Sequence, residues 1–92
     1  MRITFDASKR EQALRERGLD FARAGELFAG PTLSFADTRR DYGEVRTVTV
    51  GLLDARLAMV VWKQRGSARR VISMRHCNER DQKRFETFVA QR

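Results

Sequence analysis

Six basic side chains fall on or beside three segments that the sequence predicts to be strands: Arg46, Lys63, Arg65, Arg69, Arg70 and Arg75. If these segments pair in one sheet, a curved surface can gather several of the six into one groove. Guanidinium groups bind phosphate oxygens through parallel hydrogen bonds, and clustered cations attract a nucleic-acid backbone. The residue types therefore indicate a phosphate-binding surface, and a solvated face that only aids solubility is the alternative.

Such a surface could also support cleavage of RNA. In-line attack by the ribose 2′-hydroxyl needs a base for that hydroxyl, an acid for the departing 5′ oxygen and cations for the charge on phosphorus. His76 is the only histidine, and it is the natural acid or base candidate because free imidazole titrates near neutrality. A packing role is the alternative for His76. Glu44, Glu79 and Asp81 could act as the base, or could serve turns and a helix start.

Other residue types narrow the chemistry. Ser73 could hydrogen-bond a phosphate, but no acid or histidine at a suitable spacing makes it a nucleophile. Trp62 could stack on a base or pack in the core. Cys77 is the only cysteine, so no internal disulfide can form, and one cysteine with one histidine cannot build a zinc site from those ligands alone. We therefore expect no metal and no cofactor.

Length and charge limit the partners. The 92 residues suffice for one domain, residues 1–92, with a modest core that a partner could stabilise. The net charge is +7 overall, but residues 1–46 hold nine basic and eight acidic groups, whereas residues 47–92 hold ten and four. The uneven charge favours a nucleic-acid partner. No signal peptide is visible and the longest apolar run is too short to cross a bilayer, so we expect a cytoplasmic protein without membrane contact.

The elements that must position these side chains predict an α+β fold with an antiparallel sheet, two N-terminal helices and one C-terminal helix. We expect a short strand at 3–5, helices at 7–17 and about 21–29, and a strand from residue 32. Their boundaries follow from the capping residues Asp6 and Asp20 and from Gly18 and Gly30. Residues 45–52 and 57–64 read as a hairpin, residues 69–76 as the next strand, and residues 78–81 as a helix start.

The strand at 69–76 carries most of the candidate chemistry. A strict period of two would place Arg69, Val71, Ser73 and Arg75 on one face and Arg70, Ile72, Met74 and His76 on the other. Each face would then present cations.

Motifs along nearly the whole chain resemble the BrnT family of toxins. Residues 5–9 and 14–21 are similar to its opening, with an aromatic-Asp pair, a Lys and a later Gly-hydrophobic-polar-Phe stretch. Residues 41–46 are similar to its Gly-Glu-Glu-Arg stretch. Residues 56–62 and 70–75 resemble its Arg-Leu-apolar-Val-Val-aromatic and Arg-Ile-Ile-Ser-Ala-Arg signatures, and residues 80–86 resemble its final Arg-Glu and Tyr-Glu.

The resemblance implies a RelE-like ribonuclease, the toxin of a type II toxin–antitoxin pair. It also implies a BrnA-like antitoxin with a ribbon-helix-helix fold, and binding of operator DNA only through the antitoxin complex. The site residues that carry over are Arg46, Arg70, Ser73, Arg75 and Arg80, with Arg75 and Arg70 the main candidates for phosphate contact or transition-state charge.

The chain departs from the family pattern at three positions. Arg17 stands where the family has a histidine, His76 where it has Arg or Lys, and Phe85 where it commonly has Tyr.

The two hypotheses are thus a metal-independent endoribonuclease that inhibits growth, and a non-catalytic module that binds RNA or the antitoxin. A DNA-binding repressor is disfavoured because no helix combines several basic residues with helix-turn-helix spacing.

Overall fold

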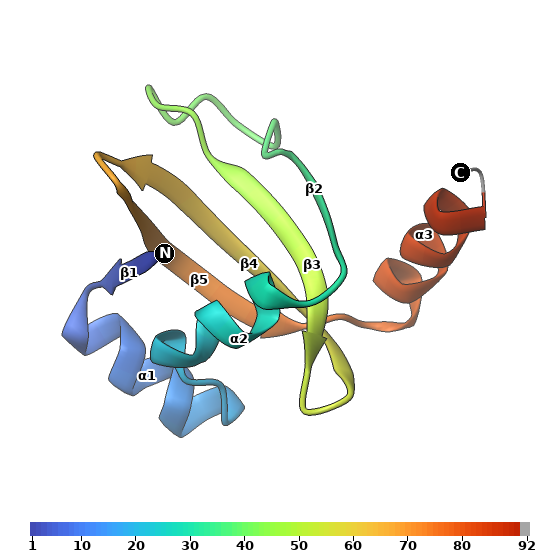
Figure 1. Ribbon diagram of the computed structural model, residues 1–92, viewed down its shortest axis with the longest axis horizontal. Helices are drawn as coiled ribbons and strands as arrows, with labels where there is room; N and C mark the ends of the chain where they lie inside the picture. The colour runs from blue at the N-terminus through green and yellow to red at the C-terminus, as the bar shows by residue number, and fades with distance from the viewer. Residues whose placement is uncertain (91–92) are drawn as a thin grey trace.

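The computed structural model of the chain describes residues 1–90, apart from the side chains of residues 88 and 89. It is an α+β fold with one five-stranded sheet, which confirms the predicted class (Figure 1). The strands are β1 (Arg2–Phe5), β2 (Thr32–Ala36), β3 (Thr47–Leu53), β4 (Arg56–Arg65) and β5 (Ala68–His76). The helices are α1 (Ala7–Arg17), the 3₁₀ turn η1 (Phe21–Arg23), α2 (Ala24–Ala29) and α3 (Glu79–Ala90).

The sheet is mixed, with the strand order β1-β5-β4-β3-β2. Strands β2 to β5 form an antiparallel meander, whereas β1 runs parallel to β5 at the edge. The predicted RelE-like fold with an antiparallel sheet and two N-terminal helices therefore does not match exactly, because β1 is parallel and the second helix is a 3₁₀ turn plus six α-helical residues. Strand direction depends on the crossing from β1 over the helices to the far edge, which local residue patterns do not encode.

Local signals explain where α1 lies. The Asp6 carboxylate accepts hydrogen bonds from the backbone nitrogens of Ser8 at 2.9 Å and Lys9 at 3.1 Å, which satisfies two free donors of the first turn. Gly18 ends the helix at φ 68°, a left-handed conformation that glycine adopts without steric cost. Asp6 therefore fixes the place where β1 turns into α1.

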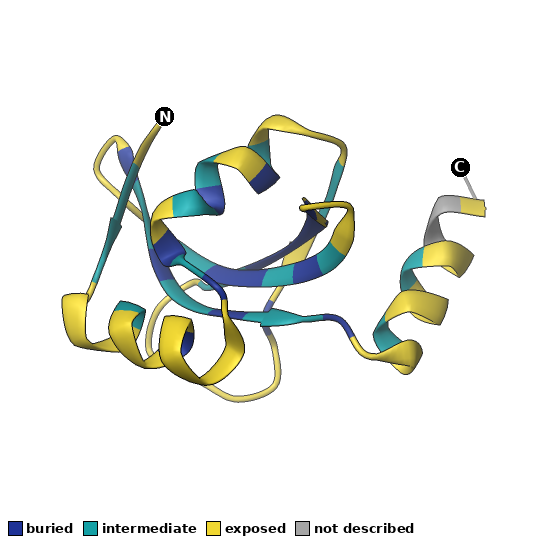
Figure 2. Cartoon of the chain, turned by 90° about the horizontal axis from the view of Figure 1, so that it is seen from below, coloured by how far each residue is buried: buried dark blue, intermediate teal, exposed yellow. Residues whose placement is uncertain are grey.

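The two faces of the sheet differ in their covering. Helices α1 and α2 and the turn η1 contribute to one apolar cluster with β3, β4 and β5, and the buried positions are dark blue in Figure 2. The side of the sheet that belongs to this cluster is called the helix face below. The opposite face, called the open face, holds a smaller apolar cluster that includes Val48, Val50 and Val61. Phe85 of α3 packs against this cluster, while the rest of α3 extends away from the meander (Figure 1). The open face is therefore the side with room for a large ligand.

A β-bulge in the pairing of β4 with β5 changes which side chains share a face. Val61 pairs with Ser73 but Trp62 pairs with Val71, so Ile72 is the extra residue. Directly paired residues project to the same side of a sheet. The bulge therefore puts Arg70, Ile72, Ser73 and Arg75 on the open face, and Arg69, Val71, Met74 and His76 on the helix face.

The strict alternation predicted for this strand is wrong because the extra residue shifts the register between Val71 and Ser73.

Candidate functional site

Three of the predicted cations meet on the open face. Lys63 of β4 pairs directly with Arg70 of β5, and Arg46 immediately precedes β3 on the other side of β4. They line one hollow of about 110 Å³, called the cationic hollow below. Its remaining lining residues are Asp6, Lys9, Glu44, Val71 and Ile72. A phosphate there would meet cations from four separate chain segments, which no local motif could have brought together.

Glu44 organises two of these cations. Its carboxylate accepts a hydrogen bond from Arg46 Nε and another from Lys63 Nζ, each at 2.9 Å. Lys63 and then Arg46 hold the pKa of this carboxyl below its usual range, so Glu44 stays ionised at neutral pH. It therefore orients the cations and accepts hydrogen bonds, but it is a poor proton donor.

Arg70 differs from Arg46 and Lys63, which both bind Glu44. Within the described part of the chain its guanidinium has no ion pair or side-chain hydrogen bond, and the residue is only half-buried. An arginine with free donors beside other cations can bind phosphate oxygens in the bidentate manner without first losing a partner. Arg70 is thus the group in the hollow best prepared for an anion.

Lys9 joins the hollow from α1, and it is not among the site residues predicted from the sequence. The cap of Asp6 on the Lys9 backbone nitrogen fixes the first turn of α1 beside Arg70 and Lys63. Hydrogen bonds, first from the Ser8 hydroxyl, lower the pKa of the Asp6 carboxyl. The available signal was the position of Lys9 three residues after a helix cap that follows a short strand. Only the parallel pairing of β1 with β5 makes that position part of the site.

Arg75 lies on the open face but is paired elsewhere. Its Nη1 donates to the Asp81 carboxylate at 2.7 Å and to the His76 carbonyl at 3.2 Å. Arg75 is the main cause of the lowered pKa of Asp81. Asp81 also exchanges hydrogen bonds with Asn78 that cap the start of α3. In this geometry Arg75 ties β5 to α3, and it does not line the cationic hollow.

His76 and Arg69 lie on the helix face, away from the hollow. His76 pairs with Ala58, and its Nδ1 is buried without a hydrogen bond to the described residues. Burial, and then the charge of Arg56, lowers the pKa of His76, so the imidazole is neutral at pH 7. The Arg69 guanidinium stacks 4.3 Å from the Trp62 ring centre and 4.6 Å from that of Phe28. The geometry therefore does not join either residue to Arg70.

The remaining candidates are spread out. Arg65 lies at the exposed end of β4, Arg80 is exposed in the first turn of α3, and Ser73 is half-buried opposite Val61. Trp62 is a packing residue, because its indole nitrogen donates to the buried Thr49 hydroxyl at 2.8 Å and its ring meets Phe28 edge to face. The alternative in which Trp62 stacks on a base is not supported.

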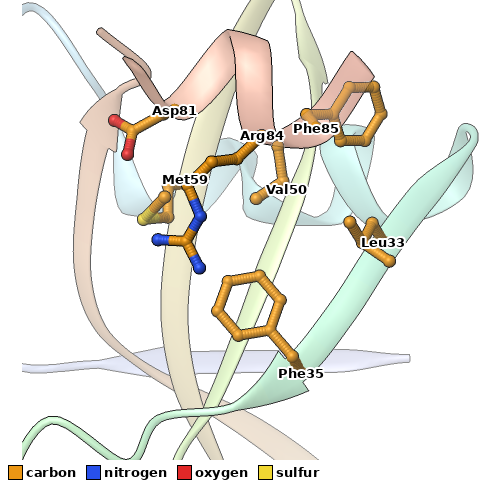
Figure 3. A pocket seen from close by; sticks show the side chains of 7 residues that line it. All are labelled: Leu33, Phe35, Val50, Met59, Asp81, Arg84 and Phe85. Carbon is orange, nitrogen blue, oxygen red and sulfur yellow. The ribbon is translucent and has the colours of Figure 1, made fainter. Parts of the chain in front are cut away.

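A larger, mostly apolar hollow of about 330 Å³ lies between α3 and the open face (Figure 3). Its lining residues are Leu33, Phe35, Val50, Met59, Asp81, Arg84 and Phe85. Figure 3 shows Arg84 reaching from α3 into the space above Phe35. Its only charged groups are Asp81, which already binds Arg75, and Arg84, so this hollow lacks the cluster of cations that a phosphate needs.

Among the described residues, no group of three or more His, Cys, Asp or Glu side chains is placed to hold a metal ion. In the same part of the chain, no helix has the length and apolar character needed to span a membrane.

One comparison with known proteins finds a match. The family model described as "Ribonuclease toxin, BrnT, of type II toxin-antitoxin system" matches residues 5–81. That span runs from the last residue of β1 into the first turn of α3, so it contains every residue that lines the cationic hollow. No curated protein matches the chain.

Proposed function

Since the chain belongs to the BrnT family of ribonuclease toxins of type II toxin–antitoxin systems, we propose that it is an endoribonuclease whose active site is the cationic hollow. One observation carries the proposal: four cations converge around one small hollow on the open face. Lys9 comes from α1, Arg46 from the loop just before β3, Lys63 from β4 and Arg70 from β5. The assignment of catalysis to this hollow rests on its charge and geometry.

The reaction would be transfer of the phosphoryl group to the neighbouring hydroxyl. The ionised Glu44 carboxylate would accept the proton of the RNA 2′-hydroxyl as its oxygen attacks phosphorus, and the bond to the 5′-oxygen breaks. The products are a 2′,3′-cyclic phosphate and a 5′-hydroxyl. Negative charge grows on the non-bridging oxygens during this step, and donors aimed at such charge are commonly the largest catalytic contribution. Arg70 and Lys63 would supply these donors. The Lys9 ammonium would protonate the departing 5′-oxygen, because an ammonium has donors but no acceptor.

This mechanism uses no metal ion, and it differs from the sequence prediction in two residues. Arg70 stays in the site, whereas Arg75 and His76 are replaced by Lys63 and Lys9 as catalytic candidates. The reason is geometric, since Arg75 binds Asp81 and His76 lies on the helix face.

The test is cleavage of a labelled single-stranded RNA by purified protein in EDTA. We expect the wild type to produce 2′,3′-cyclic phosphate ends, detected by mass spectrometry. Arg70→Ala should slow cleavage by about 10²-fold, the usual cost of removing one transition-state donor. Arg15→Ala is the matched control, since Arg15 is an exposed cation on α1 outside the hollow, and it should cleave normally.

Intact RNA with both the wild type and the control, when the protein is folded and RNA is bound, would favour the non-catalytic binding module instead.

The biological setting follows from the family. A toxin of a type II system has a protein antitoxin, and we propose that this antitoxin is BrnA-like with a ribbon-helix-helix fold. The antitoxin would neutralise the growth inhibition, and the complex would repress its own operon by binding operator DNA through the antitoxin. The substrate would be cellular RNA in the cytoplasm. Co-expression with a BrnA-like antitoxin should restore growth, and a growth defect that persists despite complex formation would contradict neutralisation.

A further inference from the structure

The chain between β2 and β3 forms a loop that is closed at its base. The Asp37 backbone nitrogen donates to the Arg46 carbonyl oxygen at 2.9 Å, so the first and last residues of the loop are held together. Arg46, one of the cations of the hollow, is therefore also the last residue of this loop. Whatever orders the loop can also order Arg46.

A buried carboxylate lies at the start of the loop. The Asp37 side chain is only 1% exposed, and it accepts hydrogen bonds from Arg39 Nε and Nη2 at 2.9 Å each. The Tyr42 hydroxyl donates to the same carboxylate at 3.0 Å. A phenol with its hydroxyl bound in this way keeps its ring in one orientation.

The Tyr42 ring in turn supports Arg46. The Arg46 guanidinium carbon lies 4.0 Å from the centre of the ring, within the range of a cation–π contact. Arg46 Nε also donates to Glu44, which binds Lys63. The ring and the carboxylate restrain the guanidinium from two directions, and the side chain is 26% exposed. A long arginine side chain that is already restrained loses less conformational entropy when it binds an anion.

We propose that Asp37 and Tyr42 are positioning residues that hold the Arg46 guanidinium ready for an RNA phosphate in the cationic hollow. The inference rests on the proposed function for the identity of the ligand. It adds that Asp37 and Tyr42 promote phosphate binding only through their effect on Arg46. Neither Asp37 nor Tyr42 lines the hollow, so neither is expected to touch the phosphate.

The first test is a double-mutant cycle on RNA binding. Affinity for a labelled single-stranded RNA is measured by fluorescence anisotropy for the wild type, Tyr42→Leu, Arg46→Ala and the double variant. Tyr42→Leu should weaken binding about threefold to tenfold, the range expected for loss of a partly buried cation–π support. Tyr42→Phe keeps the ring but loses the hydroxyl that Asp37 holds, so it should recover only part of this loss. In the Arg46→Ala background, Tyr42→Leu should have no further effect.

If Tyr42→Leu lowers the affinity for RNA equally in the wild type and in Arg46→Ala, the proposal is overturned, because Tyr42 would then act on binding independently of Arg46. Arg15→Ala serves as the control for removal of a remote exposed cation. Arg46→Ala should also lower the slope of log affinity against log salt by about one, and Tyr42→Leu should not lower it further in that background.

The second test needs no RNA. The ring should shift the Nε–H proton resonance of Arg46 in the free protein, since that group lies beside its face. Tyr42→Leu should abolish the shift, and Tyr42→Phe, which lacks the hydroxyl that Asp37 holds, should keep only part of it. An Arg46 resonance that is unchanged in Tyr42→Leu overturns the proposal.

The two tests separate the hypotheses. Wild-type protein that neither binds nor cleaves RNA refutes the proposed function, and the positioning claim then fails with it for RNA. If the wild type binds and cleaves RNA but the effects of Tyr42→Leu and Arg46→Ala on affinity are additive, the positioning role is refuted and the proposed function stands.

Discussion

The buried carboxylate of Asp37 should contribute measurably to stability, and Asp37→Asn isolates that contribution with little change in shape. The carboxylate accepts three side-chain hydrogen bonds, from two Arg39 nitrogens and the Tyr42 hydroxyl, and a weaker one from the Arg39 backbone nitrogen. A hydrogen bond to a charged group contributes about 1.5–3 kcal/mol. The Arg39 side chain is 65% exposed, so solvent weakens its interaction with the carboxylate. The net stabilisation is therefore smaller than the sum of the individual hydrogen bonds.

We therefore expect Asp37→Asn to lower the free energy of unfolding by about 2–3 kcal/mol at pH 7. For a domain of this size the corresponding fall in Tm is about 8–24 °C. Urea unfolding monitored by Trp62 fluorescence would measure the difference directly. Asp41→Asn is the matched control, because Asp41 belongs to the same loop, is exposed, and accepts one hydrogen bond from the Gly43 nitrogen that asparagine can also accept.

The pH dependence gives a second check on the same reasoning. The Arg39 side chain is the main cause that holds the pKa of Asp37 well below its usual range in the folded protein. A carboxyl with a depressed folded pKa adds stability above its unfolded pKa of about 3.9, and loses it as the pH falls through the folded value. The difference in the free energy of unfolding between the wild type and Asp37→Asn should stay constant from pH 7 to pH 5 and shrink below pH 4.

A difference in the free energy of unfolding under about 0.5 kcal/mol at pH 7, or one that widens in acid, would refute the stabilising role of Asp37. Neither result fits a buried carboxylate stabilised by charged donors.

Three further changes test other parts of the structure. Arg75→Ala should cost about 1 kcal/mol of stability in urea unfolding, because it removes a partly exposed ion pair with Asp81. The rate of RNA cleavage should stay within about threefold of wild type. A fall in cleavage as large as that of Arg70→Ala would return Arg75 to the proposed active site. Thr49→Val should cost about 1–3 kcal/mol in thermal unfolding, because Thr49 is only 1% exposed and its hydroxyl bonds both Ser34 and Trp62. An unchanged Tm would contradict this. His76 should titrate below 6.5 by NMR, so its contribution to stability should be full above pH 6.5 and fall in acid as the pH drops toward the folded pKa. His76→Gln should keep cleavage, and a cleavage defect with normal folding would restore the predicted catalytic role.

Much of the fold could be predicted because its signals are local. Asp6 marks the start of α1 because its carboxylate accepts hydrogen bonds from free backbone nitrogens, and Gly18 marks the end because it adopts a left-handed conformation. The hairpin of β3 and β4 follows from strand-forming residues on both sides of a two-residue turn, where Asp54 and Ala55 take φ values of 52° and 62°. Candidate cations could also be named, because arginine and lysine on paired strands indicate anion binding whatever the topology.

The faces on which those cations lie depend on contacts between segments distant in the sequence. The bulge opposite Val61 is a property of two paired strands, so the sequence of β5 alone predicts strict alternation and places Arg70 apart from Ser73 and Arg75. Lys9 enters the hollow only because β1 lies parallel to β5, and Arg75 is occupied only because α3 starts beside it. Capping and turn formation are local and act within a few residues, whereas register, strand direction and ion pairing are decided when the whole chain packs.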